Sequence, residues 1–166
     1  MAGDDSLLSN LVISVRLTSS DPPTFGVTVK NDNSVPVTIF TWDSPLDPLA
    51  LSLGVLSITP SGSSTPLDIP EIKISRKFPP GEDALMELGP GETSKENKLV
   101  LREMLGAKEL RERQVEKALV QCKGEWRAVW AMSRKELDQE SIEKMGTDEK
   151  AASGGYQSEV FEVAFK

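Results

Sequence analysis

The chain has 166 residues and a net charge of −7, and it contains no histidine and a single cysteine, Cys122. A chain without histidine cannot build a Ser-His-Asp triad, a Cys-His dyad or a histidine-based zinc site. One cysteine cannot form an intrachain disulfide or a cysteine-rich zinc site. The length predicts one domain, and the composition predicts a protein that has no cofactor and is not an enzyme.

The acidic charge also bears on partners and location. Residues 1–70 carry only Arg16 and Lys30 against seven aspartates, and an acidic surface repels phosphate backbones, so we expect no nucleic-acid partner. No apolar run reaches the ~20 residues of a membrane-spanning helix, so we expect no membrane partner. The start of the chain lacks signal-peptide features, no Asn-X-Ser/Thr sequon occurs, and the lone cysteine is free. These observations predict a cytoplasmic protein.

The first hundred residues alternate short apolar segments with turns rich in glycine, proline, serine and asparagine. A period of two over 11–17 is typical of a strand with one buried face. The same reasoning predicts strands, in chain order, over 25–30, 35–41, 53–59, 71–77, 84–88 and 95–101. Strands at this spacing indicate an antiparallel β-sandwich and not βαβ units. Residues 1–9 are expected to form a flexible N-terminus.

The pattern changes after residue 101. Residues 102–121 are rich in Leu, Glu, Lys, Arg and Ala, which favour helices. Glu109 and Arg113 have the i,i+4 spacing of a helical ion pair. We therefore predict one inserted helix over about 102–121.

Strand patterns return near the C-terminus. Residues 124–132 predict a strand with Trp126, Ala128 and Trp130 on one face, and 156–165 predict the last strand. Taken together, residues 10–166 are predicted to form a single domain. Its fold class is an all-β, immunoglobulin-like antiparallel β-sandwich of seven to nine strands with one inserted α-helix.

The segment between these two strands is charged and then rich in Gly, Ala and Ser. Ser133 and Glu136 have the spacing of a capping box, which predicts a short helix starting there. We expect most of 133–155 to form a mobile charged loop.

Several segments resemble a known protein family. The turn LGPGE at 88–92 precedes a strand, as in many immunoglobulin-like accessory domains. Together with VTVKN at 27–31, WDSP at 42–45 and IKISRKF at 72–78, this turn is similar to the propeptide of fungal deuterolysin-type zinc metalloproteases. The resemblance covers residues 10–101 and, more loosely, 124–165. It implies an immunoglobulin-like fold, a fungal source and a segment that helps its protease to fold and keeps it latent.

The chain departs from that family because it has no protease domain, no signal peptide and an insertion near 102–121. We therefore carry over the fold and the binding of a protein, and not the zymogen role. The expected function is a non-catalytic protein-binding module, inhibitor-like or chaperone-like, as a monomer or a weak homodimer. The alternative is a carbohydrate-binding module or a glycan-acting enzyme that uses Asp and Glu without histidine.

The residues expected to contact a partner are Trp42, Asp43, Arg76 and Lys77. Trp42 lies at a loop edge and is the candidate anchor. The basic residues Lys73, Arg76, Lys77 and Arg102 form either a patch for an anionic partner or a solvated strand face. Asp43 and Asp47 flank a proline loop, as a catalytic carboxylate pair or as turn formers.

Two further features have alternative interpretations. Trp126 and Trp130 are either an aromatic platform for a sugar or peptide or part of the core, and we expect the core. Cys122 is either a reactive thiol beside Lys123 or a buried small hydrophobe, and we expect the latter.

Overall fold

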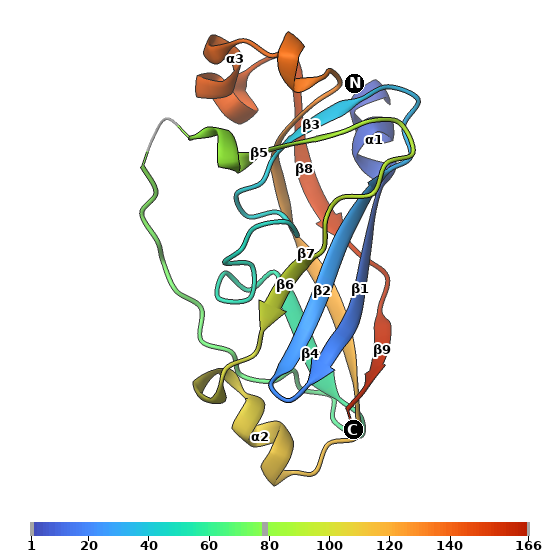
Figure 1. Cartoon of the computed structure of the whole chain (residues 1–166), viewed down its shortest axis with the longest axis vertical. Coiled ribbons are helices and arrows are strands. Elements are labelled where there is room, and N and C mark those ends of the chain that lie inside the picture. The colour runs from blue at the N-terminus through green and yellow to red at the C-terminus, as the bar shows by residue number, and fades with distance from the viewer. Residues whose placement is uncertain (1, 78–79, 166) are drawn as a thin grey trace.

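The computed structural model describes residues 2–77 and 80–165, and this part of the chain contains nine strands and a few short helices (Figure 1). The N-terminal elements are α1 (Ala2–Ser9), β1 (Leu11–Ser20), β2 (Pro23–Asn31), β3 (Val37–Phe40), β4 (Leu56–Pro60), β5 (Leu85–Leu88) and β6 (Asn97–Val100). They are followed by α2 (Ala107–Glu112), β7 (Lys117–Trp130), α3 (Gln139–Lys144), β8 (Ala151–Gln157) and β9 (Phe161–Ala164). Single 3-10 turns occupy Glu82–Ala84, Glu103–Leu105, Arg134–Glu136 and Met145–Thr147.

The strands form two antiparallel sheets, which confirms the predicted β-sandwich. The smaller sheet has the order β1-β2-β6. In the larger sheet, the first half of β7 lies between β4 and β9, and its second half lies between β3 and β8. Strand β5 extends this sheet beyond β3. None of the described helices has the length and apolar composition to cross a bilayer.

The main core fills the space between the sheets. In β1, β4 and the first half of β7, buried and more exposed side chains alternate, as expected for strands with one face toward a core. In β2, Phe25, Val27 and Val29 are fully buried, and they belong to the same cluster as Val120 and Cys122 of β7. The buried position of Cys122 confirms that it is a small core hydrophobe.

The predicted helix over 102–121 is wrong beyond its first half. Only Ala107–Glu112 is α-helical, and residues 117–121 already belong to β7. In this segment Ala118, Val120 and Cys122 are buried at a period of two, between β4 and β9. Burial and pairing on both edges outweigh the helix propensity of Lys, Ala, Leu and Gln, because propensity differences amount to only about 0.5 kcal/mol per residue.

A β-bulge divides the second half of β7. The register with β8 shifts between Trp126 and Val129, and buried side chains then follow one another along the strand. Trp126 and Val129 belong to the main core, whereas Ala128 and Trp130 belong to a second cluster on the opposite face. The prediction that Trp126, Ala128 and Trp130 share one face is therefore wrong, because the extra residue exchanges the two faces.

The second core is covered by the segment expected to be a mobile loop. The capping box of Ser133 and Glu136 is present, as predicted. Beyond it, Leu137 and Ile142 are buried against Phe40 and Trp130. The structured part, 134–147, is called the cap below, and β8 begins soon after it at Ala151. Apolar burial therefore orders most of 133–155.

Other boundaries also differ from the prediction. The expected flexible N-terminus contains α1, whose Leu7 and Leu8 pack against the main core. Residues 71–77 form no strand, although Ile72 N donates to Ser52 O over 2.9 Å and Arg76 pairs with Asp47. Met1 and Lys166, at the two ends of the predicted units, lie outside the described residues.

Replacement of Asp148 tests how the cap is attached. The Trp130 indole Nε1–H donates to Asp148 Oδ2 over 2.8 Å, and both residues are buried. We expect Asp148→Ala to lower the free energy of unfolding by about 2 kcal/mol, because the buried donor loses a charged acceptor. Glu149→Ala removes the same charge from an exposed neighbour and should change stability by less than about 0.5 kcal/mol. Urea unfolding followed by tryptophan fluorescence measures the free energy of unfolding of both variants. Equal losses would contradict the role of the Asp148–Trp130 hydrogen bond.

Because Cys122 is buried, we expect the free energy of unfolding to fall at alkaline pH. Burial raises the pKa of its thiol from 9.0 to about 12. The unfolded chain therefore loses this proton first, and stability is full below pH 9 and declines as the pH rises toward 12. We expect a decline of about 1.4 kcal/mol per pH unit from this group. Urea midpoints between pH 7 and pH 11 should fall less steeply for Cys122→Ala than for the wild type, and identical slopes would refute the assignment.

Candidate functional site: a groove beside Trp42

Three of the four residues predicted to contact a partner line one groove of about 680 Å³. They are Trp42, Arg76 and Lys77, and the groove is completed by the loop after β3 and by the turn before β5. Asp43 lies next to Trp42 but does not line the groove. The structure thus brings together two segments that are more than thirty residues apart in the chain.

The loop after β3 is organised around the buried carboxylate of Asp47. Its Oδ2 accepts the backbone N–H of Asp43 over 2.8 Å, and its Oδ1 accepts that of Leu49 over 2.9 Å. Arg76 Nη2 lies 2.8 Å from Oδ2 and 2.9 Å from Oδ1, and the Asp47 side chain is only 1% exposed. This carboxylate is therefore a structural anchor that fixes both ends of the loop.

The Trp42 ring packs against two other side chains. The guanidinium of Arg76 lies 5.1 Å from the ring centroid, within the range of a cation–π contact. The ring of Phe40, which belongs to the second core, lies 4.8 Å away at a tilt of 49°. Arg76 consequently couples the orientation of Trp42 to the buried Asp47.

Other strands hold the same loop through its backbone. Asn97 Nδ2 donates to the carbonyls of Pro45 and Asp47, each over 2.9 Å. The Tyr156 hydroxyl donates to the carbonyl of Asp43 over 2.8 Å, and Arg127 Nε lies 3.5 Å from the Asp43 carboxylate. Burial raises the pKa of Tyr156 above its usual 10.0, so its hydroxyl remains a donor. Sequence patterns did not predict these contacts, because nothing local in the sequence indicates them.

The accessible part of the groove is apolar and carries isolated charges. Leu49 is 41% exposed beside the half-buried Trp42. Lys77 is exposed and makes no ion pair with the residues that the structure describes, and Asp83 is exposed across the groove. Such an arrangement suits the binding of an apolar group near a polar one.

The remaining candidates are not part of this groove. Lys73 and Arg102 are exposed but do not line it, and Arg76 is engaged by Asp47, so the four basic residues do not act as one patch. Trp126 and Trp130 are 1% and 0% exposed, which confirms their place in the core. Within residues 2–77 and 80–165, no cluster of acidic or cysteine side chains is arranged to hold a metal ion.

Comparison with known proteins identifies relatives. Residues 10–165 match a protein family described as immunoglobulin-like domain. A protein of Arthroderma benhamiae named "Uncharacterized secreted protein" is 33% identical over 147 residues, which cover 87% of this chain and 70% of that protein. The cytoplasmic location predicted from the lone cysteine and the N-terminal sequence is wrong, since this relative is named as secreted.

Replacement of Arg76 tests the anchor of the groove. We expect Arg76→Gln to lower the free energy of unfolding by about 3 kcal/mol, because the buried Asp47 carboxylate loses its cation. Arg16→Gln is the matched control, since Arg16 pairs with Glu96 but its side chain is 71% exposed. That change should cost less than about 1 kcal/mol. Urea unfolding compares the two variants, and similar losses would show that Asp47 does not depend on Arg76.

Proposed function

Because the chain belongs to the immunoglobulin-like domain family, we propose that it is a non-catalytic protein-binding module that engages its partner through the groove beside Trp42. The observation that carries the proposal is the packing of Trp42 against Phe40 and Arg76, with the exposed Leu49 in the same groove. Tryptophan residues that are already ordered before binding are frequent anchors of interfaces, because little side-chain entropy is lost on association.

The resemblance to a protease propeptide supports a specific class of partner. The segments WDSP at 42–45 and IKISRKF at 72–78 both contribute to this resemblance, and they supply Trp42, Arg76 and Lys77 to the same groove. We propose that the partner is a deuterolysin-type zinc metalloprotease, which the module inhibits or assists in folding. A secreted relative supports action outside the cell.

The chemistry of the groove supports binding over turnover. The Asp47 carboxylate accepts hydrogen bonds from two backbone N–H groups and from Arg76, so it is not available as an acid or a base. The burial of Trp126 and Trp130 argues against a sugar platform made of these two rings. Of the three tryptophans, Trp42 alone is partly exposed, which favours a side-chain anchor over a sugar platform.

Binding to a protease tests this function directly. A purified deuterolysin-type zinc metalloprotease is titrated with the chain, and both complex formation and residual proteolysis are measured. We expect Trp42→Ala to weaken binding about 30-fold, as for a residue that contributes about 2 kcal/mol. The matched control is Leu119→Ala, because Leu119 is 43% exposed on β7 and outside the groove. This control should change affinity less than about threefold.

The two parts of the proposal fail in different ways. Absence of any complex with the protease would refute the partner class. Binding that Trp42→Ala leaves unchanged would refute the groove as the contact surface. Trp42-dependent binding to glycans in the same format would favour the carbohydrate alternative over the protein-binding function.

A further inference from the structure

An exposed extended segment lies between β4 and β5 in the chain. Residues 70–77, called the strap below, contain neither a helix nor a strand. In Figure 1 the strap is part of the green trace that runs along one side of the sandwich, away from the strands. Ile72 is 47% exposed, and the described residues that form the two cores include neither Ile72 nor Ile74. The strap is therefore displayed on the surface of the fold.

Two contacts hold the strap to the segment between β3 and β4. At one end, Ile72 N donates to the carbonyl of Ser52 over 2.9 Å. At the other end, Arg76 is bound by the buried carboxylate of Asp47. Between these points, residues 73–75 make no hydrogen bond with any residue that the structure describes. Their main-chain N–H and C=O groups therefore remain available to a partner that pairs with an extended chain.

The unpaired part of the strap presents one basic side chain. Lys73 is exposed and makes no ion pair within the described part of the chain, whereas its neighbour Ile74 is half-buried. A partner that approaches the strap therefore meets a cation. An acidic pocket complements this side chain, and a cleft that binds extended segments complements the main chain beside it. Serine endopeptidases of trypsin-like specificity combine both features, because an aspartate in their specificity pocket selects basic side chains.

We propose that the strap is a cleavage site for a serine endopeptidase that selects basic side chains, and that the bond broken is Lys73–Ile74. The serine Oγ of the protease attacks the carbonyl carbon of Lys73, and the amine of Ile74 leaves with a proton. Water then hydrolyses the acyl-enzyme, which restores the serine and leaves a carboxylate on Lys73. The site is independent of the protein-binding function proposed above, since cleavage requires no partner at the groove beside Trp42.

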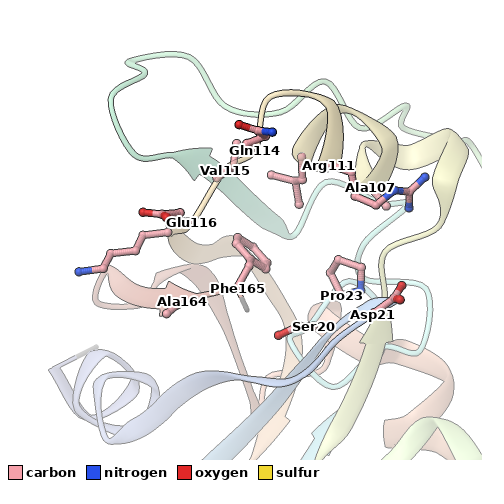
Figure 2. A pocket seen from close by; sticks show the side chains of 12 residues that line it. Ser20, Asp21, Pro23, Ala107, Arg111, Gln114, Val115, Glu116, Ala164 and Phe165 are labelled. Atoms are coloured by element: carbon pink, nitrogen blue, oxygen red, sulfur yellow. The ribbon is translucent and has the colours of Figure 1, made fainter.

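Other exposed basic residues lie where the main chain is already paired. Arg111 lies on α2, as Figure 2 shows, and its guanidinium is bound by Glu103. Lys98 is exposed on β6, in the part of that strand that pairs with β2. A protease binds several consecutive residues in extended form, so a helix or a paired strand has to open before it is cut. The strap meets this requirement without opening.

The second exposed lysine of the strap is hindered by its neighbour. Lys77 directly follows Arg76, whose side chain is only 17% exposed because it is bound by Asp47. A protease cleft cannot close around the residues before the Lys77 bond while this ion pair is intact. Among the bonds that follow a basic residue, we therefore expect Lys73–Ile74 to be cut first.

Limited proteolysis of the full chain tests this site. The folded protein is incubated with a small amount of trypsin, and the products are identified over time by denaturing and by native mass spectrometry. We expect the first products to be residues 1–73 and 74–166. The two fragments should stay together in the native spectrum, because the pairs β2–β6, β3–β5 and β4–β7 each join a strand of one fragment to a strand of the other.

Variants distinguish cleavage of the strap from cleavage of the unfolded chain. Lys73→Gln should abolish the first cut, and the matched control Lys98→Gln should change its rate less than about twofold. The destabilised variant Asp148→Ala would accelerate cleavage through global unfolding about 30-fold, but it should change the rate of the cut after Lys73 less than about twofold. A first cut at another bond, a native chain that resists trypsin, or a cut after Lys73 that accelerates with unfolding would overturn the proposal.

Discussion

The main-chain pairing of β7 on both edges is the constraint on which the rest of the structure depends. Over 14 residues this strand contacts β4 and β9 and then β3 and β8, so it joins segments from every part of the larger sheet. Backbone N–H and C=O groups inside a buried sheet need hydrogen-bond partners, and β7 supplies such partners to the strands on both of its edges. Side chains of β7 also contribute to both cores. Disorder of β7 would consequently disrupt the main core, the packing of the cap and the support of Trp42 together.

The groove beside Trp42 shows how a loop acquires a defined shape from this framework. The second core fixes Phe40, Phe40 packs against Trp42, and the buried Asp47 holds Arg76 near the same ring. A buried ion pair contributes little net stability, because both charges are desolvated, but it permits only one arrangement of its two partners. The Asp47–Arg76 pair therefore contributes specificity of shape more than stability.

Local patterns in the sequence were sufficient for the sandwich and for part of the groove. Period-two alternation over 11–17 located β1, and turn chemistry with an aromatic residue pointed to Trp42. The pairing of Asp47 with Arg76 spans 29 residues and depends on the tertiary fold, so no local pattern contains it. Helix propensity gave a wrong prediction over 117–121, because the residues that favour helices lie there in a buried strand. Cysteine content failed as a guide to location, because a well-packed domain is stable without a disulfide.

The bulge in β7 and the cap act on the same apolar cluster. The register shift between Trp126 and Val129 places Trp130 in the second core, where Leu137 and Ile142 of the cap help Phe40 to bury it. Without the cap this large aromatic ring would be more exposed to solvent, and without the shift the cap would lose Trp130 as a packing partner. The bulge and the cap, which come from different parts of the chain, thus complete the same apolar cluster.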